Sequence, residues 1–191
     1  MSATPQRLFN FIAGEQGPWQ IQRQTNRTGA PLPDAARVSV LPGVAIEAPS
    51  VSVWHLQGIT SNERYVTRDE KTALTARQPD LGRLAATCAA LIALRKNPAW
   101  WALTQDERRG IIETQSNHIA IGMRYLPAIA RRLYHCRDLA MAQPFDFVTW
   151  FEFAPADSAA FDDLLARLRE SVEWQFVDRE VDIRLAQAGP A

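Results

Sequence analysis

The last third of the chain carries the clearest alternation of hydrophobic and polar positions. The segment Phe145–Phe153 reads FDFVTWFEF, in which every odd position except Thr149 is Phe, so it predicts a strand with a buried face. The segment EVDIRL, which follows about thirty residues later, alternates as cleanly and predicts a second strand. Its inward positions are Val181, Ile183 and Leu185.

Weaker strand patterns precede these two. They lie at 38–41, 51–59, 87–96 and 129–137. The run at 87–96 fits a helix or a strand by periodicity alone, and Pro98 just after it favours a strand. Alternation in the last run directs three side chains one way, namely Arg131, Leu133 and His135. The first fifty residues are otherwise interrupted by Gly and Pro and are hard to interpret.

Helical patterns separate the strands. A short helix is expected within 67–82, and Thr104 starts a capping box, TQDE, in which Glu107 can bond back to the first turn. The helix that follows is predicted to end near Gly122. One of its faces carries Ile111, Gln115 and His118. A third helix is predicted to be capped by Asp157 or Ser158. Its apolar stripe consists of Phe161, Leu164, Leu165, Leu168 and Val172.

The order of these elements indicates an α+β fold. From residue 90 onward it is strand, helix, strand, strand, helix, strand, which is the ferredoxin-like pattern of an antiparallel sheet with both helices on one face. The weaker first half is compatible with a shortened second copy. We therefore expect two repeats: a reduced N-terminal ferredoxin-like domain at 1–89 and a C-terminal one at 90–191.

Composition narrows the functional classes. Lys and Arg number 21 and Asp and Glu also number 21, so the net charge gives no reason to expect a nucleic acid or an anionic membrane as partner. Cys88 and Cys136 are the only cysteines, and they form no zinc, redox or covalent-haem motif. The sequence shows no secretory signal and no apolar run of membrane-spanning length, so a cytoplasmic protein is expected.

His118 is the first candidate for chemistry, because it lies on the core-facing stripe of its predicted helix. A buried neutral histidine with one hydrogen bond explains such a position adequately. The alternative is a metal ligand. One histidine cannot form a zinc site without companions, whereas it suffices for haem, in which the porphyrin provides four ligands.

Arg131 is the second candidate, since strand parity places its permanent charge on the same side as Leu133. A buried cation needs a carboxylate or an anionic ligand beside it. A structural ion pair or a solvated edge position explains the residue as well. Arg132 is equally eligible to be the inward-pointing residue.

Several stretches of the chain resemble the chlorite dismutase family, in its short-chain branch. They are SNERYVTRDEKTALT, ALIALRKNPAWWALTQDERR, SNHIAIGMRYLPAIARRLYHCRDL, PFDFVTWFEFAP and EWQFVDREVDIRL. The similarity runs from about Gln57 to Leu185, and the block from His118 through Arg131 is its most specific part. The resemblance implies a dimeric α/β-barrel that binds haem b non-covalently, one per subunit.

The resemblance also implies roles for individual residues. His118 matches the proximal haem ligand and Glu173 the carboxylate that hydrogen-bonds it, an arrangement that fixes the tautomer and strengthens the imidazole as a donor. Arg131 matches the distal arginine, and Gln78 the glutamine that holds this arginine. Positions around the haem and its propionates match Tyr65, Lys96 and Trp100.

The implied reaction is the decomposition of chlorite to chloride and dioxygen. It proceeds by oxygen transfer to ferric haem and recombination with hypochlorite held near Arg131. Short-chain members are dimers, so we expect a homodimer.

Two alternatives remain. Coprohaem decarboxylase-like relatives are longer and carry glutamine where this chain has Arg131. A non-catalytic haem carrier or sensor would need only His118. A dye-decolourising peroxidase is disfavoured because its GxxDG motif is absent.

Overall fold

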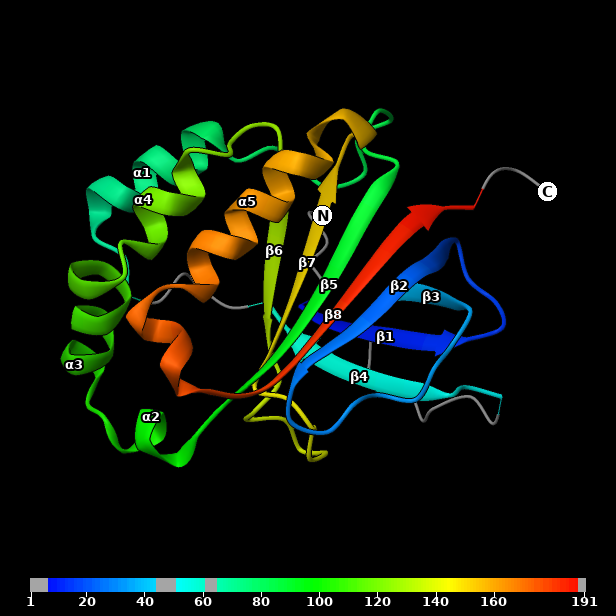
Figure 1. The fold of residues 1–191 in the computed structure, drawn as a ribbon, viewed down its shortest axis with the longest axis horizontal. Coiled ribbons are helices and arrows are strands. Elements are labelled where there is room, and N and C mark those ends of the chain that lie inside the picture. The colour runs from blue at the N-terminus through cyan, green and yellow to red at the C-terminus, as the bar shows by residue number, and fades with distance from the viewer. Residues whose placement is uncertain (1–6, 44–50, 61–64, 189–191) are drawn as a thin grey trace, which may run out of the picture.

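Strand-forming segments from both halves of the chain join in one closed sheet. The structure is a computed structural model and describes residues 7–43, 51–60 and 65–188. In these residues, eight antiparallel strands follow one another around the barrel in the order β1-β3-β2-β8-β5-β7-β6-β4 (Figure 1). The strands are Leu8–Gly14 (β1), Trp19–Thr28 (β2), Arg37–Pro42 (β3), Trp54–Ile59 (β4), Cys88–Lys96 (β5), Ala130–His135 (β6), Phe147–Phe153 (β7) and Val177–Gln187 (β8).

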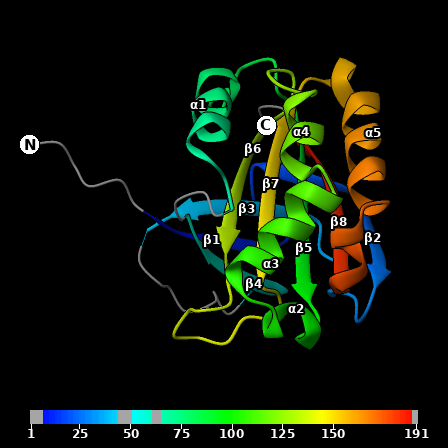
Figure 2. The same cartoon turned by 90° about the vertical axis from the view of Figure 1, so that its left-hand side faces the viewer.

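The helices lie on one side of the strands of the second half (Figure 1). Figure 2 looks onto this layer, with α3 and α4 in front of β5, β6 and β7. The α-helices are Arg68–Arg77 (α1), Pro98–Ala102 (α2), Gln105–Arg109 (α3), His118–Met123 (α4) and Ser158–Arg169 (α5). A π-helix, Gly110–Gln115 (η1), and the 3-10 helices Pro155–Asp157 (η2) and Val172–Phe176 (η3) complete the set in the described residues.

Two hydrophobic layers stabilise this arrangement. The barrel interior takes side chains from both halves of the chain, among them Phe11, Leu56, Trp150 and Ile183. The second layer lies between the sheet and α5, where Phe161, Leu164, Leu165 and Leu168 are buried as the sequence predicts. Each such burial contributes about 1.5–3 kcal/mol. The boundary between the expected domains 1–89 and 90–191 stays a prediction. It falls within β5, which starts at Cys88, and the barrel core takes residues from both sides of it.

The predicted strands at 38–41, 51–59, 87–96, 129–137 and 145–153 are confirmed as β3 to β7, with somewhat different ends. The strand EVDIRL is part of β8, and its predicted inward residues line the barrel. The strand Phe147–Phe153 is buried on both faces, because Val148 and Trp150 enter the barrel while Phe151 and Phe153 pack under α5. A closed barrel covered by helices leaves this strand no solvent face.

The helix after Thr104 differs from its prediction. Thr104 and Glu107 form the expected capping box. The predicted continuous helix to Gly122 is wrong, because Asn117 adopts a left-handed conformation (φ 52°, ψ 35°) and a new helix starts after it. That helix ends at Met123, so the predicted end near Gly122 is confirmed.

The helix α5 starts where it is predicted to start, but the capping bond and the end of the apolar stripe differ from the prediction. Asp157 occupies the N-cap position without a side-chain capping bond, and the Ser158 hydroxyl donates to the Pro155 carbonyl instead. Val172 lies beyond α5, in η3. None of the described helices is long and apolar enough to cross a membrane.

The barrel closes at a tight contact between β4 and β6. Their register pair is Ile59 with His135. A Cβ placed on Gly58 would lie 2.6 Å from Tyr134 Cβ and 3.1 Å from Cys136 Sγ, which is closer than side chains tolerate.

Replacing Gly58 with alanine should therefore overpack this closure and lower the free energy of unfolding by about 1–3 kcal/mol. Gly110→Ala is the matched control, because nothing lies within 4 Å of a Cβ there and the backbone is helical. Urea unfolding of both variants measures the effect. Equal stability of the two variants would contradict the close approach of β4 to β6.

Candidate functional site

The face of the sheet that lies toward the helices carries the candidate site. Arg131 of β6 pairs with Phe151 of β7, and the Phe151 ring packs on Phe161 of α5 at 5.0 Å between centroids. Because side chains alternate along a strand, Arg131 lies on this helix-facing side. Arg132 lies on the other side, with its guanidinium carbon 5.8 Å from the centre of the Phe9 ring. The register therefore agrees with the predicted strand parity.

The break at Asn117 determines how His118 is presented. Residues two apart on a regular helix point in different directions. The π-helix η1 and the left-handed Asn117 remove this restriction, so Ser116 and His118 both contact Glu173. The Glu113 carboxylate accepts from the Ile119 backbone N–H at 3.2 Å and supports the first turn of α4.

Glu173, in η3, is the centre of a buried polar group. Its Oε2 lies 2.6 Å from His118 Nδ1, and its Oε1 accepts from Lys96 Nζ at 3.0 Å. Lys96 Nζ also donates to the Glu173 carbonyl at 3.1 Å, while the Glu173 N–H donates to Ser116 Oγ at 2.9 Å. We call these four residues the Glu173 cluster. It joins the end of β5, the start of α4 and η3.

The two charges of the Glu173 cluster depend on each other. Burial alone would raise the pKa of Glu173, but attraction to His118 and Lys96 holds it well below the usual range. Burial lowers the pKa of Lys96, and the attraction of Glu173 opposes that shift. The Lys96 and Glu173 side chains are 2% and 9% exposed, so neither charge has water as a substitute partner.

Aromatic rings enclose the lysine. Lys96 Nζ lies 4.6 Å from the centre of the Trp100 ring and 5.8 Å from that of Trp174. Trp100 is buried, and its contact with Lys96 places this predicted residue beside the Glu173 cluster. Tyr65 precedes α1 in a left-handed conformation (φ 64°) and, among the described residues, makes no hydrogen bond to the cluster.

Gln78 contacts Arg131 through the main chain. Its Nε2 donates to the Arg131 carbonyl at 2.8 Å. Arg83 reaches the preceding loop and donates to the carbonyls of Pro127 and Ala128 at 3.1 and 2.7 Å. The segment after α1 thus fixes the backbone from which the Arg131 side chain extends.

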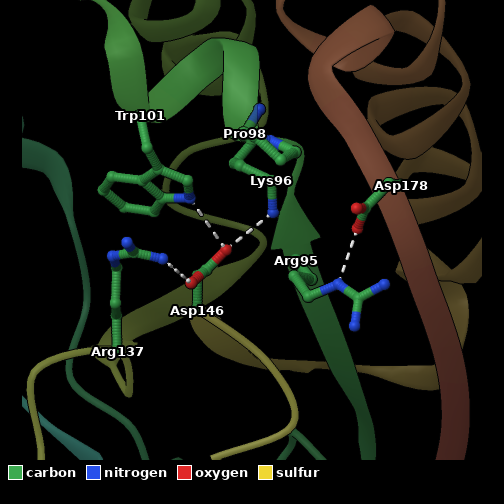
Figure 3. A pocket seen from close by; sticks show the side chains of 7 residues that line it. All are labelled: Arg95, Lys96, Pro98, Trp101, Arg137, Asp146 and Asp178. Carbon is green, nitrogen blue, oxygen red and sulfur yellow. Dashed lines mark hydrogen bonds and ion pairs between the residues drawn. The ribbon is translucent and has the colours of Figure 1, made fainter.

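A pocket of about 380 Å³ lies at the C-terminal end of β5, beside Arg95 and Lys96 (Figure 3). Its lining consists of Arg95, Lys96, Pro98, Trp101, Arg137, Asp146 and Asp178. The buried Asp146 carboxylate accepts from the Lys96 backbone N–H at 2.7 Å and from Trp101 Nε1 at 3.3 Å, and pairs with Arg137 at 3.3 Å. This carboxylate therefore fixes the end of β5 that carries Lys96.

The donor set of the site is a single imidazole. In the part of the chain that the structure describes, no group of three or more His, Cys, Asp or Glu side chains could hold a metal ion. Glu173 engages His118 Nδ1, so Nε2 is the ring nitrogen left to bind a ligand. The His118 side chain is 26% exposed, which gives a ligand access to it.

Comparison with known proteins identifies the family. The chain is similar to a dimeric chlorite dismutase from Nitrobacter winogradskyi, with 50% sequence identity and a TM-score of 0.87 over 94% of this chain and 99% of that one. The chain belongs to the chlorite dismutase family. No family model matches it.

Other members of the chlorite dismutase family are more distant. A chlorite dismutase from Ideonella dechloratans is 32% identical over 130 residues, which are 63% of this chain and 40% of that protein. A chlorite dismutase from Candidatus Nitrospira defluvii, in complex with imidazole, shares 19% identity and a TM-score of 0.66 over 96% of this chain and 92% of that one. The latter likeness concerns the fold alone.

Two residues that contact the candidate site or support it were missed by sequence reasoning. Ser116 contacts Glu173 only because of the break at Asn117, and no periodicity signals that break. Asp146 falls at a polar position of FDFVTWFEF, which suggests solvent exposure, yet it is buried. A carboxylate between Phe145 and Phe147, directly before a buried strand, was the available signal for its role.

Lys96→Met tests the mutual dependence of the two charges. The substitution keeps the volume of the side chain but leaves Glu173 buried without its ammonium partner, so it should lower the free energy of unfolding by about 3–5 kcal/mol. Arg167→Met is the matched control, because it removes an exposed ion pair with Asp163 and should change stability little. Urea unfolding at pH 7 measures both. A loss no larger for Lys96→Met than for the control would refute the compensation.

Proposed function

We propose that this chain is a haem b enzyme that decomposes chlorite to chloride and dioxygen. The observation that carries the proposal is the Glu173 cluster, which orients one histidine in a chain that is 50% identical to a chlorite dismutase. The chain spans about 40% of the length of the curated Ideonella relative. The activity and partners of the chain are therefore part of this proposal and are argued from its site.

The residues fit a haem. A porphyrin contributes four nitrogen ligands to the iron, so one imidazole is the only ligand that the protein has to provide. A metal ion without a porphyrin would need more protein ligands. His118 would bind the iron through Nε2, and one haem would be held non-covalently in each subunit. When bound, the haem would supply the ferric iron that takes an oxygen atom from chlorite.

Glu173 and Lys96 would determine the tautomer of His118 and its strength as an iron ligand. With Nδ1 protonated, the ring would donate a hydrogen bond to the carboxylate over the 2.6 Å between Nδ1 and Oε2, which fixes the tautomer and makes the ring a stronger donor at Nε2. Lys96 keeps this buried carboxylate ionised. Trp100, packed on the lysine, keeps water away from the pair.

Arg131 would act on the substrate. Its guanidinium stays charged at any working pH, so it would attract the chlorite anion to the helix-facing side of the sheet. The same charge would hold hypochlorite until it recombines with the oxygen atom that was taken from chlorite, which releases chloride and dioxygen. Gln78 would assist by fixing the Arg131 backbone. Tyr65 would contact a propionate, a role that rests on family resemblance.

We also propose a homodimer of two-repeat subunits. The dimeric Nitrobacter protein, similar over 94% of this chain, supports the homodimer. The strand order β8-β5-β7-β6, with helices on one face, supports a ferredoxin-like C-terminal repeat. The strands β1 to β4, with no helix among the described residues between them, then form the reduced N-terminal repeat.

The haem-loaded protein should release dioxygen rapidly when chlorite is added. His118→Ala should abolish tight haem binding, because the iron loses its protein ligand. His55→Ala is the control, since His55 hydrogen-bonds Asn10 on β1, away from the Glu173 cluster. An oxygen electrode and a haem titration measure both effects. Loaded protein that releases no dioxygen would instead indicate a haem carrier or sensor.

Arg131→Ala should lower kcat/KM for chlorite by about tenfold or more, because a charged contact to the anion is lost. Fewer turnovers should precede haem bleaching, since hypochlorite escapes more often. Arg132→Ala removes the same charge from the neighbouring position on the opposite face and should have a smaller effect. Equal effects of the two substitutions would show that only the net positive charge matters.

A further inference from the structure

A second buried charged group lies next to the Glu173 cluster and has no part in the function proposed above. On β8, Glu180 and Asp182 are 2% and 1% exposed. Arg169, at the end of α5, donates from Nε to Glu180 at 2.8 Å and from Nη2 to Asp182 at 2.8 Å. Arg184 donates to Asp182 at 2.6 Å and to Asp162 at 2.7 Å.

Trp174 connects this group to the Glu173 cluster. Its indole N–H donates to Glu180 Oε2 at 2.8 Å. Trp174 follows Glu173 directly in η3, and its ring lies 5.8 Å from Lys96 Nζ. The two oxygens of Glu180 thus have separate partners, because Oε1 binds Arg169 and Oε2 binds the indole.

The helix η3 needs such an anchor. It is a five-residue 3-10 helix whose N-cap, Ser171, makes no side-chain capping bond. So short a helix is not stable by itself. Its position therefore depends on bonds to neighbouring elements. The Glu173 cluster supplies one set of bonds, and the indole of Trp174 supplies another on the side of β8.

Stability alone is a weak explanation for these buried charges. Apolar residues of similar volume usually replace a buried ion pair without loss of stability. An apolar residue at position 180 would, however, leave the partly buried Trp174 indole N–H without its acceptor. A carboxylate serves both neighbours, since one oxygen takes the guanidinium and the other takes the indole.

We propose that Glu180 is a positioning residue for the iron ligand. It anchors Trp174, which fixes η3 and so sets the hydrogen bond from His118 to Glu173. The part of this inference that concerns iron rests on the proposed function. The part that concerns η3 stands on the protein alone.

Two substitutions break the anchor in different ways. Trp174→Phe keeps an aromatic ring but removes the N–H. Glu180→Gln offers one oxygen in place of two, and the guanidinium of Arg169 would take it, leaving the amide NH₂ facing the indole. Asp182→Asn is the matched control, because it weakens the same buried network without touching Trp174.

Two readouts test the proposal on the full chain. Amide hydrogen exchange within η3 should become about tenfold faster in both anchor variants, as expected for the loss of one hydrogen bond to a charged group. In haem-loaded samples of equal occupancy, the ferrous iron–histidine stretching frequency should fall and the reduction potential should rise, because a loosened Glu173 makes the imidazole a weaker donor. Asp182→Asn should leave both readouts unchanged even where it lowers the melting temperature.

Three outcomes would overturn the proposal. They are unchanged exchange in both anchor variants, an equal change in Asp182→Asn, and faster exchange with no change at the iron. Combining Trp174→Phe with Glu180→Gln should not speed hydrogen exchange within η3 beyond either single change, since both remove the bond between the indole and Glu180. If the wild-type chain binds no haem, the proposed function fails, while the exchange data still decide whether Glu180 anchors η3.

Discussion

The site depends on one ionised carboxylate that has been removed from water. Glu173 can be buried only because Lys96 and His118 bind its two oxygens, and each of these partners comes from a different element. The end of β5, the start of α4 and η3 are therefore held by a shared electrostatic requirement in addition to apolar packing. Loss of either Lys96 or Glu173 leaves a buried charge without its main compensation, which proteins tolerate poorly.

The same requirement accounts for the irregular helical segment between β5 and β6. A straight helix from Thr104 to Gly122 would keep regular hydrogen bonding, yet it would present Ser116 and His118 in different directions. The π-helix and the left-handed Asn117 give up regular hydrogen bonding to bring both residues to Glu173. Irregular helix geometry is common at functional sites for this kind of reason.

Much of the fold followed from local patterns. Alternation gave β7 and β8, and the apolar stripe gave α5, because buried faces impose their period on the sequence. In contrast, β1 and β2 were not recognised, since Gly and Pro surround them and most of β2 is polar and partly exposed. Pattern alone raised His118 and Arg131 only as candidates, and the roles of Glu173, Lys96 and Gln78 came from family resemblance. Contacts made across the fold, such as that of Ser116 with Glu173, leave no periodic trace in the sequence.

The residues of the Glu173 cluster are distributed unevenly along the chain. Every member of the Glu173 cluster lies after residue 88, whereas β1 to β4 contribute to the barrel core and to its closure at Gly58. Selection on β1 to β4 therefore concerns shape, and selection on the rest of the chain concerns shape and chemistry together. Insertions and deletions among the first four strands can accumulate through evolution as long as the sheet still closes. The length of this region can therefore change independently of catalysis.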